Sequence, residues 1–477
     1  MRRLNLILGM LSIGLSAGVL TAQDLSVKSA TGKAVQLEWT GASATAALER
    51  SSPQGFAKIA PGDTGHFTDT SIAPFGTYKY RINTGGRFSN EVTVGPPPAG
   101  VTNAAPAPAG SEYDKYGPAT AVDLDENGDP VIAFEWIDPN GDGDAADTEI
   151  RFVRWDRAAY KWVAPVRVIT TGSMTDQEVN PIAVSCDRSN GTIAVFTPVG
   201  DNLSYEVSTD HGATWKNSSV TNTGGTPHAI AMAIASGQLF AVVNAEQAQT
   251  YFTGPAADSS SWKAQSISAG EGWKARNSSN IALAVDSSGN IALGFFEDQE
   301  EGDGHRYVLW RPGQKDPVAI STGGTTDTPD IALTYGGNNF GALFAVQLDS
   351  NDSDHWVWYS QSSDANSWSK PVKLPIDGPR STNPPLGLAI DSKGAITAAF
   401  GSNSGSDAAV CNSPTVSRSS DGTNWKTCGL GKAAGADFSP QPATLHVIEA
   451  LNDAAYVVWQ EPGETKYKPG VLVWHER

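Results

Sequence analysis

The chain has 477 residues, enough for two or three domains, and its formal net charge is −18 at neutral pH. Gly, Ser, Thr, Asn and Asp are abundant and apolar residues come in short runs, so the composition predicts many strands and turns. The acidic charge opposes nucleic acid and anionic membrane surfaces as partners. It is compatible with calcium, cationic partners or neutral glycans, and it also suits a simply soluble secreted protein.

The N-terminus predicts a secretory signal peptide. Arg2 and Arg3 precede an apolar stretch that ends in small residues around "LTAQ". We expect cleavage near Ala22, which removes residues 1–22 and leaves a mature charge of about −20, because two arginines are lost. No later segment is apolar over about 18 residues, so we expect no membrane span. The sequence therefore predicts a secreted or periplasmic protein, which we take to be a monomer.

Residues 24–97 predict a small β-sandwich. Apolar positions alternate in "VQLEWT" and "YKYRIN", and Gly, Pro and Asp turns separate the strands. Trp39 and the alternating tyrosines of the second motif resemble the fibronectin type III domain. The resemblance implies a spacer or adhesion module and carries no site. Residues 98–110 are rich in Pro and Ala and predict an extended, semi-rigid linker.

Residues 111–477 repeat a unit of four strands. Seven apolar hairpins run from "TAVDLDENGDPVIAFEW" to "LHVIEALNDAAYVVWQE", with turn residues 46 to 63 positions apart. Six further hairpins, most of which close with a tryptophan, alternate with them, and "VLVWHER" remains as a lone last strand. A period of this length built from strands alone predicts an all-β propeller. We expect seven blades, with six as the alternative, and a segment within residues 101–116 that pairs with the last strand and closes the ring.

Four of the tryptophan-closed turns share a motif. The motif residues are Ser208, Asp210, Gly212 and Trp215 in "STDHGATW", Asp364 and Trp368 in "SSDANSW", Asp421, Gly422 and Trp425 in "SSDGTNW", and Asp258 and Trp262 in "ADSSSW". They resemble the Asp-box, or bacterial neuraminidase repeat, which occurs in sialidases and in many unrelated propellers. We expect each aspartate to accept hydrogen bonds inside its own turn, the glycine to allow a positive φ, and the tryptophan to pack between blades. The motif therefore predicts architecture and not a catalytic centre.

The topology predicts where a ligand binds. Turns inside both hairpin types lie on one face, and loops from second to third strands and between blades lie on the opposite face, which usually carries ligands in propellers. The ligand-face candidates are Arg276, Arg306, Arg380, Glu135, Glu178, Glu297 and Tyr113. Asp298 is a further acidic candidate there, and Trp136, Trp273 and Trp356 are candidates for stacking on sugars.

The loop "DPNGDGDAADTE" resembles the EF-hand calcium loop. Its candidate ligands are Asp138, Asn140, Asp142, Asp144 and Glu149, at loop positions 1, 3, 5, 7 and 12. Ala145 departs from the pattern, and no helices flank the loop. The resemblance implies a structural calcium ion, and a solvated acidic turn is the alternative.

The three cysteines divide into a pair and a single residue. Cys411 and Cys428 flank one predicted hairpin at similar distances from its turn, which predicts a disulfide in an exported protein. Cys186 lies in the apolar strand "IAVSCD", where we expect a buried free thiol.

The sequence leaves two functions open, and it does not decide whether the protein is an enzyme. One is a non-catalytic propeller that binds a glycan or an extracellular protein on the face opposite the Asp-box turns. The other is a glycoside hydrolase of the sialidase type, with a carboxylate pair as acid and base. Sialidases hold a substrate carboxylate with three arginines, the first in an Arg-Ile-Pro tripeptide that is missing here. A polysaccharide lyase is a third possibility, for which His228, His305 and His355 are available but not tied together.

Overall fold

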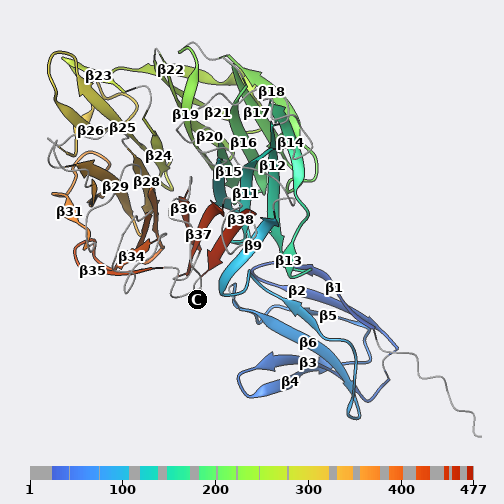
Figure 1. The fold of residues 1–477 in the computed structure, drawn as a ribbon. Coiled ribbons are helices and arrows are strands. Elements are labelled where there is room, and N and C mark those ends of the chain that lie inside the picture. The colour runs from blue at the N-terminus through green and yellow to red at the C-terminus, as the bar shows by residue number, and fades with distance from the viewer. Residues whose placement is uncertain are drawn as a thin grey trace, which may run out of the picture. The chain divides into compact units, whose positions relative to one another are not determined.

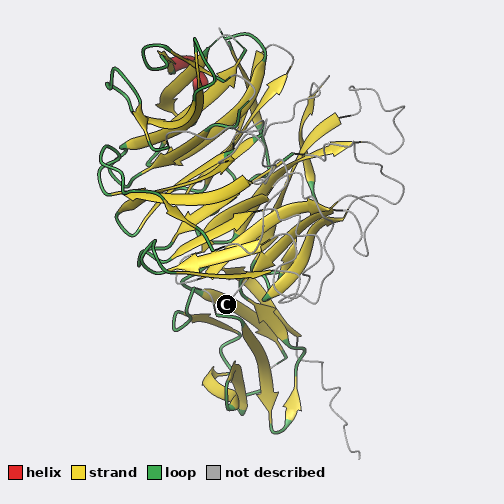
Figure 2. Ribbon diagram, turned by 60° about the vertical axis from the view of Figure 1, so that its left-hand side comes forward, coloured by secondary structure: helices red, strands yellow, loops and turns green. Residues whose placement is uncertain are grey.

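A computed structural model describes residues 24–475 apart from internal gaps. The gaps are 42, 75, 107–118, 138–147, 172–181, 200–201, 222–223, 247, 277–278, 322–329, 348–354, 376–385, 401–414, 430–444, 451–453 and 462–469. The chain forms two compact units, one of residues up to Ala30, Ala34–Ile72 and Thr77–Val94, and one of Thr31–Lys33, Ala73–Gly76 and Gly95–Arg477. Within the described ranges the only helical segment is the 3-10 helix η2, Ser259–Ser261 (Figure 2).

The first unit consists of two antiparallel sheets that share one core. One sheet has the order β1-β2-β5, and the other has the order β4-β3-β6-β7 with β8 also paired to β6. The strands are β1 Asp24–Ala30, β2 Val35–Thr40, β3 Ala46–Ser52, β4 Gly55–Pro61, β5 His66–Asp69, β6 Tyr78–Thr84, β7 Arg87–Phe88 and β8 Val92–Val94. Burial alternates along β2, so that Trp39 points into the core, where it is joined by Tyr80 of β6.

The second unit is built from antiparallel sheets whose strands pair in chain order. The first three sheets contain β10 Thr120–Leu124, β11 Pro130–Ile137, β12 Thr148–Asp156, β13 Lys161–Trp162 and β14 Val166–Thr171; then β15 Ala183–Asp187, β16 Thr192–Val199, β17 Asn202–Ser208 and β18 Lys216–Val220; then β19 Pro227–Ala235, β20 Gln238–Ala245, β21 Gln249–Pro255 and β22 Lys263–Ile267. The predicted hairpins of this part of the chain are therefore present.

The next three sheets follow the same plan. They contain β23 Trp273–Ala275, β24 Ala282–Val285, β25 Ile291–Gln299, β26 His305–Trp310 and β27 Val318–Ala319; then β28 Ile331–Gly336, β29 Asn339–Gln347, β30 His355–Ser362 and β31 Val372–Lys373; then β32 Leu386–Ile390, β33 Ile396–Phe400, β34 Thr415–Ser419 and β35 Trp425–Gly429. The β23–β27 sheet differs from its neighbours, because β23 and β24 both pair with β25.

The closing sheet joins the two ends of the second unit. It contains β36 Leu445–Ala450, β37 Ala454–Glu461, β38 Gly470–His475 and β9 Gly100–Pro106, and β9 pairs antiparallel with β38 (Figure 1). This pairing confirms the predicted closure by a segment that precedes the first repeat. It also differs from the linker expected over residues 98–110, because Ala104 and Ala105 are buried in the core that β9 shares with β38.

The innermost strands make the second unit a β-propeller. Each packs on the next in a closed cycle of β10, β15, β19, β24, β28, β32, β36 and β10 again. The close approach demands small residues, since a Cβ on Gly336 of β28 would lie 2.0 Å from the carbonyl oxygen of Ile390 in β32. Each sheet has two ends. We use the name "rim" for the end at which the loop connects the second strand to the third, and the name "turn end" for the opposite end.

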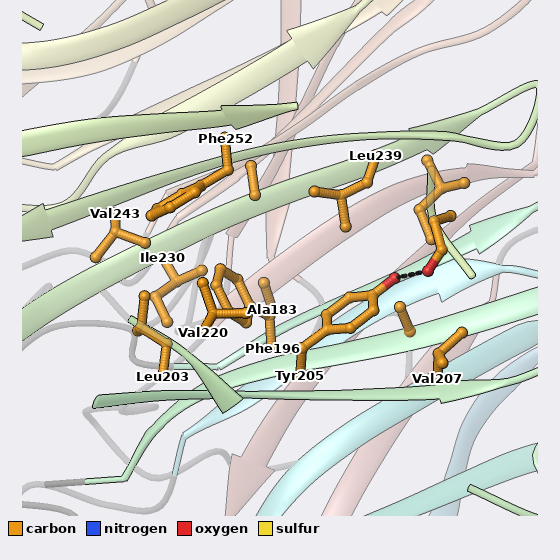
Figure 3. Close-up of a cluster of buried hydrophobic side chains, with 14 of the residues drawn as sticks. Ala183, Phe196, Leu203, Tyr205, Val207, Val220, Ile230, Leu239, Val243 and Phe252 are labelled. Atoms are coloured by element: carbon orange, nitrogen blue, oxygen red, sulfur yellow. Dashed lines mark hydrogen bonds between the residues drawn. The ribbon is translucent and has the colours of Figure 1, made fainter. Parts of the chain in front are cut away.

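Apolar side chains fill the spaces between neighbouring sheets. Figure 3 shows the cluster between the β15–β18 and β19–β22 sheets, where Phe196, Tyr205 and Phe252 pack together. The Tyr205 hydroxyl lies inside this cluster and donates a hydrogen bond to the carbonyl oxygen of Ala256. Cys186 is a buried free thiol, as predicted, and it lies in the apolar cluster between the β10–β14 and β15–β18 sheets.

Candidate functional site

The rim of the β23–β27 sheet gathers most of the described ligand-face candidates. There β23 pairs with the end of β25, and the start of β26 pairs with the same end from the other side. Arg276 follows β23, Glu297 and Asp298 lie near the end of β25, and His305 and Arg306 begin β26. We call these five residues the rim cluster.

Arg276 and His305 both bind the carboxylate of Asp298. The Arg276 guanidinium donates to both carboxylate oxygens, at 2.9 and 2.8 Å, and the Nδ1 of His305 lies 2.7 Å from Oδ1. Phe296 supports both partners, since Arg276 lies over its ring and His305 stacks on it. Burial alone would raise the pKa of Asp298, but the bonds from Arg276 and His305 outweigh it, and the pKa lies below its usual value.

Arg306 binds the carboxylate of Glu297 in a separate pair. Its Nε and Nη2 lie 2.7 and 2.6 Å from Oε2, and the backbone N–H of Gly270 donates to Oε1 at 2.9 Å. Glu297 is 0% exposed, and the guanidinium lies 4.0 Å from the centre of the Trp273 ring. Because Glu297 is buried, breaking this pair is strongly destabilising, since removing either residue leaves its partner's charge unpaired.

The two pairs lie on opposite faces of the sheet. Successive residues of a strand point to opposite faces, and residues paired in register share a face. Glu297 is paired with Arg306, whereas Asp298 is paired with His305. Two arginines on opposite faces do not form one clamp for a substrate carboxylate. Likewise Glu297 and Asp298 do not flank one bond as an acid and a base.

Each of the three rim tryptophans has a cation over its ring. Arg151 lies 3.9 Å from the ring centre of Trp136, and Lys373 lies 3.0 Å from that of Trp356. Burial lowers the pKa of Lys373. The cations hold the rings in place and cover part of their surface, so they limit stacking on a sugar to the remaining ring area.

The other predicted site residues fall into two groups. Glu135 accepts a bond from the Ala119 backbone N–H at 3.2 Å, and Glu149 accepts bonds from Arg151 at 2.9 Å and Arg167 at 3.3 Å. The other predicted site residues lie outside the described part of the chain, and the predicted disulfide involves Cys411, which also lies outside it: Arg380, Glu178, Tyr113, Asp138, Asn140, Asp142, Asp144 and the Cys411–Cys428 pair. Within the described ranges no group of His, Cys, Asp and Glu is arranged to hold a metal ion.

The turn end carries the motif around Asp210. Ser208 donates from its hydroxyl to Asp210 at 2.8 Å, and Thr214 donates from its backbone N–H at 2.8 Å and from its hydroxyl at 2.6 Å. The bonds from Thr214 and Ser208 lower the pKa of Asp210 to about 2. Gly212 has φ +83°, and Trp215 packs edge-on against Phe152 of the preceding sheet.

The related turns repeat this arrangement. Asp364 accepts backbone bonds from Asn366 and Ser367, and Asp421 accepts them from Thr423 and Asn424, each at 2.8 Å. The tryptophans also pack on the preceding sheet, through the contacts Trp262–Tyr205, Trp425–Tyr359 and the cluster around Trp368. The hydrogen bonds of these aspartates are thus local to their turns, which suits a structural role, while His211 of the first turn also lies 3.3 Å from Glu126, in the turn between β10 and β11.

Sequence reasoning missed the partners that neutralise the rim candidates. Arg151 and Lys373, which lie over two of the tryptophans, the Gly270 N–H and Phe296 were not among the predicted site residues. The signal was present in the register of "FFED" against "HRY", which places opposite charges directly across two strands. Among the described residues no helix has the length and hydropathy needed to cross a bilayer.

Comparisons with known proteins give similarity of fold only. No family model matches the chain, and no curated protein matches it. The α-L-arabinofuranosidase Arb93A from Fusarium graminearum is 10% identical, with a TM-score of 0.44, over 79% of this chain and 97% of its own. The Hadza microbial sialidase Hz136 is 10% identical, with a TM-score of 0.43, over 96% and 93%. The Aleuria aurantia lectin is 14% identical, with a TM-score of 0.41, over 67% and 98%. At such low identity and TM-score the similarities do not assign an activity or a ligand.

Proposed function

We propose that the protein is a secreted, non-catalytic propeller of seven blades with Asp-box turns, and that it binds a glycan or an extracellular protein through its rim. The closed cycle of innermost strands supports the blade count. The local bonds of Asp210, Asp364 and Asp421 support the Asp-box assignment. The shared burial of Trp39 and Tyr80 supports a fibronectin type III-like sandwich as the first unit.

One observation carries the choice of binding over hydrolysis. Arg276 and Arg306 lie on opposite faces of one sheet, and each is neutralised by a carboxylate of that sheet. A sialidase-type site needs several arginines and an acid in one pocket. The rim instead presents tryptophan rings beside paired charged side chains, which suit recognition of a ligand without bond cleavage.

Calcium binding by residues 138–149 remains a separate proposal. Glu149 would have to exchange its bonds with Arg151 and Arg167 for the ion. A calcium titration followed by thermal unfolding tests this, since an ion bound by the folded state raises the melting temperature. An unchanged melting temperature at millimolar calcium contradicts the proposal.

The function is tested by a glycan panel assayed both for binding and for product release. We expect binding without product. Trp273→Ala should weaken binding and lower the melting temperature less than Trp262→Ala does, because the bonds between Arg306 and Glu297 do not involve the indole ring. Trp262→Ala at the turn end is the matched control, and it should lower stability while leaving the affinity of the folded protein unchanged. Released sugar in any reaction would instead make the protein a hydrolase. Absence of binding to every glycan, with binding to an extracellular protein, would select the other ligand class.

A further inference from the structure

The first residue of β21 buries a side-chain amide at the rim of the β19–β22 sheet. Gln249 is 2% exposed, yet neither its Oε1 nor its Nε2 has a hydrogen-bond partner in the part of the chain that the structure describes. Buried amides are normally paired, because an unpaired one loses its hydration without compensation. A buried acceptor and donor that the surrounding chain does not satisfy are candidate contacts for a ligand.

The side chain of Gln249 points toward the β23–β27 sheet. Gln249 is paired in register with Asn244 of β20 and with Ile267 of β22, so the three side chains share one face. Asn244 Nδ2 donates to the carbonyl oxygen of Ser279 at 2.8 Å, and Ser279 directly precedes β24. Ile267 packs in the apolar cluster that joins the two sheets. The buried amide therefore lies on the face that adjoins the β23–β27 sheet.

The facing side of the β23–β27 sheet carries Glu297, Arg306 and Trp273 at the same end. Glu297 is paired in register with Arg306, whose guanidinium lies over the Trp273 ring. Phe295 lies two residues before Glu297 and belongs to the same cluster as Ile267, so this face turns toward the β19–β22 sheet. The two faces thus meet at the rim.

The groups gathered here favour an uncharged polar ligand. Glu297 and Arg306 neutralise each other, so the pair leaves no net charge beside the amide. Gln249 offers one acceptor and one donor side by side, and two neighbouring hydroxyl groups match them, since one donates to Oε1 and the other accepts from Nε2. The Trp273 ring adds an apolar surface of the kind that packs against the C–H groups of a sugar.

We propose that Gln249 is the hydroxyl-binding residue of a saccharide subsite at the rim, between the β19–β22 and β23–β27 sheets. Its amide bonds to two neighbouring hydroxyl groups of one neutral sugar residue, and the free part of the Trp273 ring lies against the apolar side of that sugar. The subsite rests on the proposed function and narrows its ligand to a neutral glycan with a vicinal diol. Because Gln249 is 2% exposed, only the edge of a sugar ring reaches the amide.

The test compares the wild type, Gln249→Leu and Gln265→Leu, each as the full chain, by calorimetric titration and thermal unfolding. The probes are the methyl glycosides of glucose, galactose, mannose and arabinose, each with its monodeoxy analogues. We expect the wild type to bind at least one glycoside, and to bind it roughly tenfold or more weakly when either hydroxyl of one neighbouring pair is missing. Gln249→Leu should bind the parent glycoside as weakly as those analogues, at an equal or higher melting temperature, because leucine removes a buried unpaired amide.

Gln265→Leu is the matched control, because Gln265 is exposed on the same face of β22. It should keep the affinity and melting temperature of the wild type. A lower melting temperature for Gln249→Leu with unchanged affinity would overturn the subsite and give the amide a structural role, such as a bond to an ordered water only. Binding that Trp273→Ala weakens but Gln249→Leu leaves unchanged would overturn the subsite while the proposed glycan function stands. A wild type that binds none of the glycosides would contradict both.

A second variant covers the case in which Gln249→Leu does not fold. Gln249→Asn keeps a polar amide but withdraws it by one methylene group, so it should lose affinity for the parent glycoside and no longer distinguish it from the deoxy analogues. Full discrimination by Gln249→Asn would contradict the subsite.

Discussion

The carboxylates at the turn end and at the rim of the propeller differ in their burial and in the origin of their hydrogen-bond partners. At the turn end, Asp210 is exposed, and its partners Ser208 and Thr214 lie within four residues of it. At the rim, Glu297 is fully buried, and its partners are Gly270, which precedes β23, and Arg306 of β26. The turn aspartates organise their own loops, whereas the rim carboxylates join strands.

The turn aspartates make contacts within a few residues of the chain, whereas the rim carboxylates make contacts between strands. A turn that bonds to itself needs only its own few residues, so the same motif recurs in several sheets. A charged pair between strands depends on register and burial, so its effect on stability is larger and specific to one sheet. Substitutions at the two ends should therefore differ in their effect on stability, with the largest loss at the rim.

Replacement of Glu297 by Ala should have the largest effect. The Glu297 side chain is 0% exposed, and its removal leaves the Arg306 guanidinium and the Gly270 N–H without their hydrogen-bond acceptor. We expect a loss of about 3–5 kcal/mol in the free energy of unfolding, measured by urea titration. Glu301→Ala in the exposed loop nearby is the control and should change it by less than about 0.5 kcal/mol. If Glu297→Ala lowered the free energy of unfolding only slightly, the rim carboxylates would contribute no more to stability than the turn aspartates.

Replacement of Trp215 by Ala should have the next largest effect, because the ring links two sheets. Its edge-on contact with Phe152, at 5.2 Å between ring centres, would be lost together with part of the surrounding core. We expect a loss of about 2–3 kcal/mol, since the side chain is only partly buried. Trp215→Phe keeps an aromatic ring and should recover part of the stability. A loss confined to ligand binding would contradict a structural role for this turn.

Replacement of Gly212 by Ala should cost about 2 kcal/mol. Its φ is +83°, and a Cβ there would lie 2.5 Å from the Phe152 ring. Ala365 in the related turn already tolerates φ +57°, so Ala365→Gly is the reverse control. We expect that change to be nearly neutral, because relief of backbone strain offsets the loss of a buried methyl group. Melting temperatures of the two variants measure the contrast.

Replacement of Asp210 by Ala should have the smallest effect and should depend on pH. Folding lowers the pKa of Asp210 to about 2, so its stabilisation is present above the unfolded pKa of about 3.9 and is lost as the pH falls toward 2. The melting temperature of the variant should therefore lie below that of the wild type at pH 6, and the difference should shrink by pH 2.5. Ligand affinity at pH 6 should not change. A large loss of affinity at an equal melting temperature would place the turn in a binding site.

Much of the architecture could be predicted because it depends on the pattern of apolar and turn residues within short segments of the sequence. The alternation in "VQLEWT" predicted a half-buried strand, and the structure buries Val35, Leu37 and Trp39 on one side of it. The repeated hairpins predicted sheets of four strands, and the missing strand predicted the pairing of β9 with β38. The linker expectation was incomplete, because composition alone did not show that residues 100–106 complete a sheet.

The candidate site was less predictable. Arg276, Arg306 and Glu297 lie at one end of the β23–β27 sheet, yet the sequence did not show that the two arginines lie on opposite faces and are already paired. Nor did it show that the Asp330 carboxylate, at the start of β28, bonds to the starts of β24 and β32. These facts depend on register and on which sheets adjoin, and both are set by the packing of the whole ring.

The strands, their turns and the local hydrogen bonds of the turn aspartates depend on residues a few positions apart, so the amino-acid sequence alone predicts them. The charges that meet, the rings that carry cations and the carboxylate that joins three strands are known only from the folded chain. Those contacts form between residues distant in the chain, where burial and register decide the pairing rather than the order of the residues.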